Sequence, residues 1–379
     1  MKVLFIHNTM PDYRIPFFKK LSEKIDVEYV FTNINLNKKI YNNDINYSSV
    51  QNLSIKYLSQ GRKHYKELIN ILKEDNYDYV IIPPMDSLNE YLDAVISFII
   101  AKIKNKKILY FWEKWEAPNN RTPLKKKIKN SLQRIMCKPI IQNVDMCIAS
   151  GTKSKEYFQK YNISTDKIQI AYDACEVELR NNIENIRKKN KIPMNEKIIL
   201  YYGRIVERKG LDILIKAFKE VQEIIDDNIH LMICGDGEFR QKCEQLVWNL
   251  NIDNVYFEGH INPIDRDKYF LQSDIFVLPS YFYEGIPEAW GLTVNEAIQF
   301  KTAIIATTAV GSAFDLIEEE NGMMIKESSK EELKNALIHY IKNYNKSSIS
   351  KKSEEILNKI NYDTMSDSFV DALKKIKKI

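Results

Sequence analysis

Glycine and cysteine are scarce in this sequence and long apolar runs are missing, and each shortage excludes a class of protein. The 379 residues include 11 glycines and 5 cysteines. The cysteines are scattered and odd in number, with no Cys-x-x-Cys pair, which indicates a reducing compartment and argues against a structural zinc site. No apolar run approaches the roughly 20 residues that a membrane-spanning helix needs, and the N-terminal residues have no signal-peptide pattern. These absences favour a cytoplasmic protein.

A glycine-rich dinucleotide motif is missing as well. Residues 3–7 form an apolar stretch typical of a buried strand, but the loop that follows, residues 8–14, contains no glycine. A Rossmann site for NAD or FAD needs closely spaced glycines at this point, so that the backbone can approach the pyrophosphate. The sequence therefore argues against both cofactors.

The length and the pattern of the chain are typical of two α/β domains. A chain of 379 residues is too long for one ordinary core. Short apolar strands alternate with amphipathic helices, which predicts parallel sheets covered on both faces. We expect domains at residues 1–185 and 196–350, no strand after 303–307, and helices at 351–379 that cross back to the first domain. The asparagine-rich residues 33–52 show no period and are expected to form a variable excursion.

Residues 284–296 are the densest group of candidate site residues. They follow an apolar strand at residues 274–279 and lead into a helical pattern, and ligands bind beyond the carboxyl ends of strands in open α/β sheets. The stretch contains the carboxylates of Glu284, Glu288 and Glu296. Carboxylates can accept hydrogen bonds from vicinal hydroxyls, which suits a sugar or a ribose. The alternative is that the glutamates are helix-start residues favoured by the helix dipole.

A second candidate site lies in the loop at residues 203–210. Gly203 allows the chain to turn, Arg204 and Lys209 are cations, and Gly210 opens a helix whose N-terminus favours anions. The lysine precedes the last glycine, so the loop does not match the Walker phosphate-binding motif. Cations at a helix N-terminus are unfavourable by themselves, so we expect an anionic ligand here. The alternative is that these residues are charged caps around a helix start.

Two shorter motifs are less specific. Gly235 and Gly237 follow an apolar strand at residues 229–234 and permit either close approach to a ligand or a tight turn. Asp265 and Asp267 have the spacing of a metal-binding pair, but they stand where a helix begins, so Asp265 is interpreted as an N-cap. We predict no metal site.

The loop at residues 111–116 is the candidate site of the first domain. It follows a predicted strand and contains two tryptophans and two glutamates, including Glu113. Such a loop could stack on a sugar and accept a proton. The alternative is a surface loop whose tryptophans are buried against a neighbour.

Residues 124–139 predict a basic amphipathic helix. They carry six basic residues and no acid. Their apolar positions Leu124, Ile128, Leu132, Ile135 and Met136 share one helical face. A helix of this kind can lie on an anionic membrane surface. The alternative is a core-facing helix with a solvated basic side. No aromatic interleaving or nucleic-acid motif is present, so we predict no nucleic-acid partner.

The motifs at residues 203–210, 235–237 and 288–296 occur in the order found in the retaining glycosyltransferases of family 4, which this sequence resembles over residues 197–324. The resemblance implies a GT-B fold, in which two Rossmann-like domains face each other across a cleft. Residues 288–297 and 309–312 look most like members that build bacterial capsular and lipopolysaccharide chains. The first domain matches only loosely, through residues 13–18.

The resemblance also implies roles for single residues. Arg204 and Lys209 would bind the donor diphosphate, Glu288 would meet the donor sugar and Glu296 the ribose. The nucleotide sugar would be surrounded by Gly203, Arg204, Lys209, Gly235, Gly237, Glu288, Gly291, Leu292, Thr293 and Glu296. Many members carry a histidine after the fourth strand of the first domain. The corresponding loop has none here, and Glu113 is the candidate to take that place.

The sequence therefore predicts a retaining glycosyltransferase that needs no cofactor or metal. Its donor would be a UDP- or GDP-linked sugar and its acceptor a glycan or a lipid-linked sugar of a cell-surface polysaccharide. Peripheral contact with the anionic inner membrane stays open. The alternatives are an epimerase or phosphorylase of the same fold, although no pyridoxal-binding lysine is evident, or a catalytically dead protein that binds sugar nucleotides. The presence of Arg204, Lys209, Glu288 and Glu296 together argues against a dead site.

Overall fold

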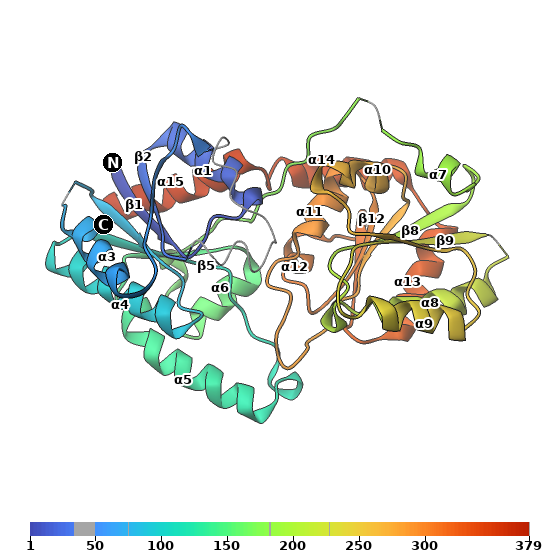
Figure 1. Cartoon of the computed structure of the whole chain (residues 1–379), viewed down its shortest axis with the longest axis horizontal. Helices are drawn as coiled ribbons and strands as arrows, with labels where there is room; N and C mark the ends of the chain where they lie inside the picture. Colours follow the sequence, from blue (N-terminus) through green and yellow to red (C-terminus); the bar gives the residue numbers. More distant parts are fainter. Residues whose placement is uncertain (34–49, 75, 182, 227, 379) are drawn as a thin grey trace. The chain divides into compact units, whose positions relative to one another are not determined.

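The computed structural model describes residues 1–33, 50–74, 76–181, 183–226 and 228–378. The chain divides into two compact units, each built around one parallel sheet (Figure 1). The first unit comprises Met1–Trp115, Lys127–Ala174 and Asn361–Ile379, and the second comprises Glu116–Lys126 and Cys175–Ile360. These limits differ from the expected ones, because residues 116–126 belong to the second unit and the chain returns to the first unit at Asn361 instead of at residue 351.

The first sheet has seven strands, in the order β3-β2-β1-β4-β5-β6-β7, and all of its pairs are parallel. The strands are β1 (Lys2–His7), β2 (Asp26–Phe31), β3 (Ser54–Tyr57), β4 (Tyr79–Ile82), β5 (Lys107–Trp112), β6 (Met146–Ala149) and β7 (Ile168–Ile170). Helices cover both faces, so the central strands are apolar along their whole length. Most of the predicted excursion at residues 33–52 lies outside the described residues.

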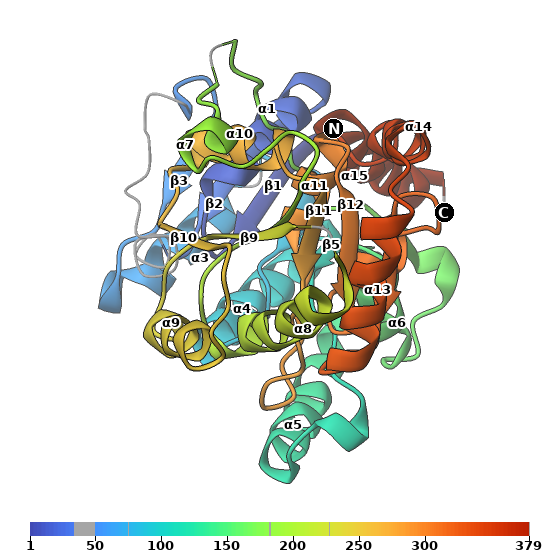
Figure 2. The same ribbon diagram turned by 90° about the vertical axis from the view of Figure 1, so that its right-hand side faces the viewer.

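The helices of the first unit follow the predicted alternation. They are α1 (Ile15–Lys24), α3 (His64–Lys73), α4 (Leu88–Ile103), α5 (Leu124–Ile141), α6 (Thr152–Gln159) and α15 (Tyr362–Lys378). The C-terminal helix α15 packs beside α1 (Figures 1 and 2). Phe369 of α15 lies 5.0 Å from Phe17 of α1 and 5.8 Å from Phe5 of β1, measured between ring centroids. The predicted return of the C-terminus to the first domain is confirmed for α15.

The second sheet has six parallel strands in the order β10-β9-β8-β11-β12-β13. They are β8 (Lys197–Tyr202), β9 (Ile229–Cys234), β10 (Val255–Gly259), β11 (Ile275–Leu278), β12 (Ala303–Thr307) and β13 (Gly322–Ile325). The expectation of no strand after residues 303–307 was wrong. The added strand β13 is short, contains a glycine and two methionines, and pairs on one side only, so its β pattern is weak.

Helices cover both faces of the second sheet as well. They are α7 (Ile186–Lys189), α8 (Leu211–Ile224), α9 (Arg240–Asn249), α10 (Arg266–Leu271), α11 (Leu292–Gln299), α12 (Ala313–Leu316), α13 (Lys330–Lys342) and α14 (Lys346–Leu357). Figure 2 shows α8, α9 and α13 on one face, with α10, α11 and α14 on the other. Helix α14 packs on α11 and stays with the second unit, so only one of the two predicted tail helices crosses back. The predicted α/β class with two parallel sheets is confirmed.

Candidate active site

The loops after β8, β9 and β10 are joined through their backbones at the carboxyl edge of the second sheet. The amide of Gly203 donates to the carbonyl of Cys234 (3.0 Å), and the amide of Gly235 donates to the carbonyl of Gly259 (2.7 Å). A side chain at position 235 would collide with the carbonyl of Gly203, and one at position 237 with the carbonyl of Ile205. The close approach of these loops therefore requires glycine at positions 235 and 237. At Gly203 the space is open, and the constraint is its φ of 152°.

Glu288 is the centre of the charged group at this edge. Its carboxylate oxygen Oε2 accepts from Lys209 Nζ at 2.7 Å and from Arg208 Nη1 at 2.6 Å. Burial raises the pKa of Glu288, but the charges of Lys209 and Arg208 outweigh it and lower the pKa to about 2. The backbone of Glu288 is held by Ala309 and Gly311, which belong to the motif at residues 309–312. Glu288 is thus an ionised carboxylate in a fixed position.

The cations beside Glu288 differ in part from the predicted pair. Lys209, one of the two predicted diphosphate ligands, is buried just before Gly210, where α8 begins, and pairs with Glu288. Arg204 is exposed, and its side chain forms no ion pair with any described residue. Arg208 holds the position next to Lys209 instead. The only signal for Arg208 in the sequence was a third cation in the same loop.

Glu296 lies on α11 and forms a second ion pair. Its Oε1 accepts from Arg266 Nη1 and from the thiol of Cys175, whose Sγ is 3.8 Å away. Within the described part of the chain, Oε2 of Glu296 is buried and has no hydrogen-bond partner. Burial raises the pKa of Glu296, although the charge of Arg266 opposes the shift. The sequence offered no signal for Arg266, which starts helix α10.

The first turn of α11 completes this group. Gly291 precedes the helix with φ of 94°, and the space beside it is filled by Val310 and Leu278. Leu292 and Thr293 are half-buried at the start of the helix. The hydroxyl of Thr293 is buried and has no partner among the residues that the structure describes. A helix start with a hydroxyl of this kind suits an anionic group.

Glu284 and Asp265 do not belong to the charged groups around Glu288 and Glu296. Glu284 is exposed in the loop before Glu288 and adopts a φ of 49°. Asp265 stands at the N-cap position of α10, but its side chain makes no capping bond and instead accepts from Arg180 Nη1 at 2.5 Å. Asp265 is therefore not the capping residue that the sequence predicted. Among all described residues, no group of three or more histidines, cysteines or acids could hold a metal ion.

Glu113 of the first unit belongs to a different kind of cluster. It is paired with Arg14, which also donates to Asp173 Oδ1 at 3.3 Å and lies 5.1 Å from the centre of the Phe111 ring. Arg14 and Asp173 are buried, whereas the side chain of Glu113 is 32% exposed. Burial raises the pKa of Asp173 to about 6, with Arg14 partly opposing the shift. The three residues follow β1, β5 and β7, so the cluster sits at the carboxyl edge of the first sheet.

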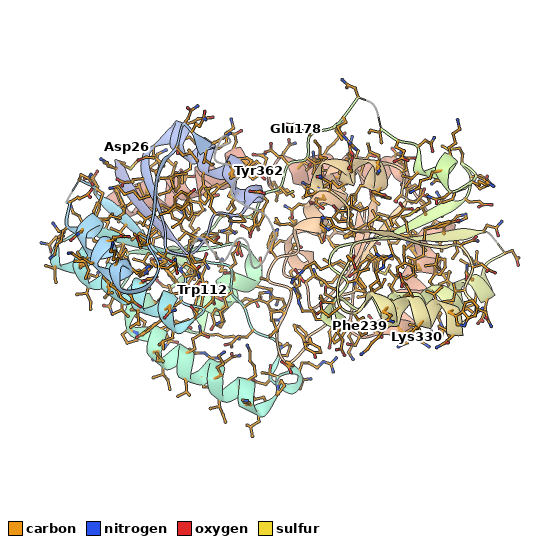
Figure 3. All side chains as sticks on the ribbon, viewed as in Figure 1. Asp26, Trp112, Glu178, Phe239, Lys330 and Tyr362 are labelled. Atoms are coloured by element: carbon orange, nitrogen blue, oxygen red, sulfur yellow. The ribbon has the colours of Figure 1, made fainter. Side chains whose placement is uncertain are left out.

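The tryptophans of the loop at residues 111–116 do not lie on the surface. Trp112, labelled in Figure 3, is 3% exposed and donates to Asp86 at 3.2 Å. Trp115 is 7% exposed. The hypothesis that these rings stack on a sugar was wrong, and the alternative of buried tryptophans is confirmed.

A cavity of about 630 Å³ lies near the same edge of the first sheet. None of the described residues that line it is aliphatic. They are Thr32, Asn33, Gln60, Gly61, His64, Tyr65, Ser87, Asn89, Glu90 and Asp93. Two of the acids are already engaged, because Asp93 accepts from His64 at 2.7 Å and Glu90 accepts from Asn8 at 2.8 Å. The cavity therefore offers a wall of hydrogen-bonding groups to a polar ligand.

Helix α5 turns its apolar face to solvent. The side chains of Leu124, Ile128, Leu132, Ile135 and Met136 are 43% to 73% exposed. The residues that α5 buries are Asn130, Cys137, Ile140 and Ile141. The helix is tied to the region of α4 by Tyr91, whose hydroxyl donates to the carbonyl of Met136 (3.3 Å), and lies outside α4 in Figure 1. The alternative of a core-facing apolar stripe was therefore wrong.

No helix within the described ranges has the length and apolar character to cross a membrane.

Comparisons with known proteins relate the second unit to a family of glycosyltransferases. Residues 182–356 match the family of glycosyl transferases, group 1. An uncharacterized glycosyltransferase of Methanocaldococcus jannaschii is 24% identical over 285 residues, which cover 75% of this chain and 70% of that protein. Alpha-monoglucosyldiacylglycerol synthase of Streptococcus pneumoniae is 26% identical over 187 residues, which cover 47% of this chain and 41% of that protein.

A solved structure extends the likeness to both units. HepE of Anabaena, crystallised in complex with UDP, has a TM-score of 0.75 at 15% identity, with 99% of this chain and all of that chain covered. This likeness shows the fold, and the predicted GT-B class with two α/β sheets is confirmed. Residues 182–356 of this chain therefore match the glycosyl transferases of group 1, and the chain has the GT-B fold.

Proposed function

We propose that the protein transfers a sugar from a nucleotide-sugar donor to a glycan or lipid-linked acceptor in the synthesis of a cell-surface polysaccharide or glycolipid. The observation that carries this proposal is the ion-paired Glu288, held by Lys209 and Arg208 at the carboxyl edge of a sheet in a group 1 domain. Ligands bind at this edge in open α/β sheets. Retention of the anomeric configuration is part of the proposal and rests on the resemblance to family 4.

The cations would act on the diphosphate of the donor. Two cations face one carboxylate in this group, so a net positive charge is available to an anionic ligand. Negative charge grows on the diphosphate as the bond to the sugar breaks, and fixed cations stabilise that charge. Arg204 could join them from the exposed loop. We infer that these side chains and the start of α11 supply this stabilisation without a metal ion.

The two glutamates would divide the donor between them. Glu288 would accept hydrogen bonds from the transferred sugar, and Glu296 from the ribose through its free oxygen Oε2. We propose a UDP-linked donor, because HepE was crystallised with UDP and with UDP-glucose. GDP is the second candidate.

The acceptor would be bound by the first unit. The polar cavity beside Glu90 and Asp93 suits a group rich in hydroxyls. By the resemblance to family 4, Glu113 would take the place of the histidine that many members carry near the reacting hydroxyl. A carboxylate paired with arginine accepts hydrogen bonds and does not donate them, so we infer that Glu113 orients the acceptor or the sugar.

Helix α5 would bring the enzyme to its acceptor by binding an anionic membrane. Its exposed apolar stripe is flanked by the exposed Lys125, Lys129 and Lys138, and no acid occurs in the helix. A helix with an apolar face and basic flanks lies in the membrane interface. Each lysine near an anionic surface is worth about 1 kcal/mol, and the apolar stripe adds a contribution that salt does not screen.

Vesicle sedimentation tests this part of the proposal. The protein should pellet with anionic vesicles more than with neutral ones, and high salt should reduce pelleting. Replacing Lys125, Lys129 and Lys138 by Gln should weaken pelleting and leave donor hydrolysis intact. The matched control replaces the exposed Lys346, Lys351 and Lys359 of the second unit, which changes the net charge equally. If both triple variants pellet like the wild type, α5 does not bind the membrane.

Donor turnover tests the proposal as a whole. The purified protein is incubated with a panel of UDP- and GDP-sugars, and release of the nucleoside diphosphate is followed. We expect release from at least one donor and a strong loss in Lys209→Ala. Lys216→Ala serves as control, because Lys216 forms a surface pair with Asp212 on α8. Conversion of a donor to its epimer without release would favour an epimerase instead.

A further inference from the structure

Arg266 connects the loop after β10 to Glu296. Its Nε donates to the carbonyl of Pro263 at 2.6 Å, and its Nη1 donates to Oε1 of Glu296. The side chain of Arg266 is 22% exposed and that of Glu296 is 7% exposed. The guanidinium therefore fixes one oxygen of a buried carboxylate while it is itself fixed by the backbone.

The other oxygen of Glu296 is left for a different donor. A buried carboxylate oxygen without a hydrogen bond is costly, and such groups are rare in folded proteins. Oε2 of Glu296 is buried and has no partner within the described residues. Because Arg266 occupies Oε1, the carboxylate cannot rotate freely to satisfy Oε2 elsewhere. A ligand hydroxyl would remove the cost.

A second ion pair of the same unit differs from this arrangement. Asp267 is buried next to Arg266 in sequence, and Arg180 donates to both of its oxygens, at 2.5 Å and 3.0 Å. The amide of Lys268 adds another bond at 2.8 Å. Every oxygen of Asp267 is therefore satisfied by the protein, as expected of a purely structural pair, whereas Glu296 is satisfied on one side only.

We propose that Arg266 is a positioning residue that fixes the carboxylate of Glu296 with Oε2 directed at the ribose, so that the site selects ribonucleotide donors over nucleotides that lack the 2′- and 3′-hydroxyls. This inference rests on the proposed function, since it assumes that the second unit binds a nucleotide sugar. It adds a specificity-determining residue outside the predicted motifs, together with a class of ligand that the site rejects. The ribose hydroxyls would donate to Oε2, and a donor without them would leave that oxygen unpaired.

The test compares binding of ribose and dideoxyribose nucleotides. Calorimetry measures the dissociation constants of UDP and 2′,3′-dideoxy-UDP, and of GDP with its dideoxy form. In the wild type we expect the nucleotide that binds to lose about tenfold in affinity when the hydroxyls are removed, which corresponds to about 1.4 kcal/mol. The ratio of the dissociation constants of the dideoxy and ribose forms measures this selectivity. In Arg266→Gln this ratio should fall below about threefold, mainly because the ribose form binds less tightly.

Two further variants separate positioning from general damage. Arg266→Lys keeps a cation beside Glu296 but loses the planar guanidinium that also reaches Pro263. Its ratio should therefore lie between those of the wild type and Arg266→Gln. Lys268→Gln is the control, because Lys268 lies on the same helix and pairs with the exposed Glu184, and it should keep the wild-type ratio. If Arg266→Gln does not fold, Glu296→Gln and Arg266→Lys are measured in its place, since both should lower the ratio of the two dissociation constants.

The outcomes distinguish this inference from the proposed function. A ratio near one in the wild type, or an unchanged ratio in Arg266→Gln or in Glu296→Gln, overturns the role of Arg266 while nucleotide binding still stands. If the wild type binds neither UDP nor GDP, the proposed function fails, and this inference fails with it.

Discussion

The carboxyl edges of the two sheets both carry a cluster of arginine and carboxylates, but the clusters have opposite charge. In the second unit, Arg208 and Lys209 face the single carboxylate of Glu288. In the first unit, Arg14 is shared by Glu113 and Asp173. His7 adds no charge to the cluster of the first unit, because burial and Arg14 lower its pKa to about 3. An excess of cations suits a diphosphate, whereas an excess of carboxylates suits neutral hydroxyls and repels phosphate.

The two clusters also differ in how they are built. Arg208 and Lys209 are neighbours in one loop, whereas Arg14, Glu113 and Asp173 come from three loops that are far apart in sequence. The pKa of Glu288 is lowered and that of Asp173 is raised. Because Arg14, Glu113 and Asp173 join three separate loops around a buried arginine, we predict that the loss of Arg14 destabilises the fold more than the loss of a cation beside Glu288 does.

Removing the arginine of the first cluster should have the largest effect on stability. Arg14→Met leaves Asp173 buried without its counter-ion, and breaking a buried pair from one side costs about 3–5 kcal/mol. Urea unfolding measures this change. Arg204→Ala is the control, since Arg204 is exposed and surface substitutions stay within about 0.5 kcal/mol. A cost below 1 kcal/mol for Arg14→Met would contradict the difference between the clusters.

Neutralising Glu288 should act on the reaction more than on nucleotide binding. Loss of one fixed group that stabilises a transition state lowers kcat by about 10²–10³. Glu288→Gln should show a loss of this size in transfer or donor hydrolysis, with a smaller change in the affinity for UDP. Glu284→Gln should behave like the wild type, because Glu284 is exposed. Equal losses of UDP affinity and of turnover in Glu288→Gln would show that this residue does not act on the sugar.

The dependence of stability on pH should have opposite sign for the two clusters. The folded pKa of Glu288, about 2, lies below the ordinary 4.5, so its stabilisation is lost as the pH falls through this interval. The folded pKa of Asp173, about 6, lies above the ordinary 3.8, so its contribution is present at low pH and is lost as the pH rises toward 6. Each shift corresponds to roughly 3 kcal/mol.

Urea midpoints measured from pH 2 to pH 8 check these signs. Asp173→Asn should remove the loss of stability between about pH 4 and pH 6, and Glu288→Gln should reduce the loss below about pH 4.5. If both variants change the profile in the same pH interval, the electrostatic contrast between the clusters is wrong.

Local sequence patterns were enough to predict the central strands of both sheets and the loops of the second unit. Strands Lys197–Tyr202 and Ile229–Cys234 were predicted with their observed limits, because each is a continuous apolar run ended by a glycine. Lys209 and Glu288 also come from short motifs, and the structure brings them together. The edge strands Ser54–Tyr57 and Gly322–Ile325 were missed, since each has only four residues and neither is a continuous run of residues with high β propensity.

Features that depend on tertiary contacts could not be predicted. The partner of a charged side chain is chosen by the fold, so no pattern distinguished Arg208 and Arg266 from the other basic residues. In the same way, the amphipathic period of residues 124–139 showed that the helix has an apolar face. It did not show whether that face or the basic face packs against the rest of the protein. The structure places that face on the outside, where Ile128 and Ile135 are 54% and 69% exposed.

The affinity of the second unit for a nucleoside diphosphate tests the central claim most directly. UDP and GDP are titrated into the wild type, Lys209→Ala, Arg208→Ala and the control Lys216→Ala by calorimetry. The account predicts micromolar or tighter binding of one diphosphate, a loss of about 1.5–3 kcal/mol in Lys209→Ala and in Arg208→Ala because each loses a charge-assisted contact, and no change in Lys216→Ala. If the wild type binds neither diphosphate, or if both loop variants bind as tightly as the wild type, the cations beside Glu288 do not form a diphosphate site.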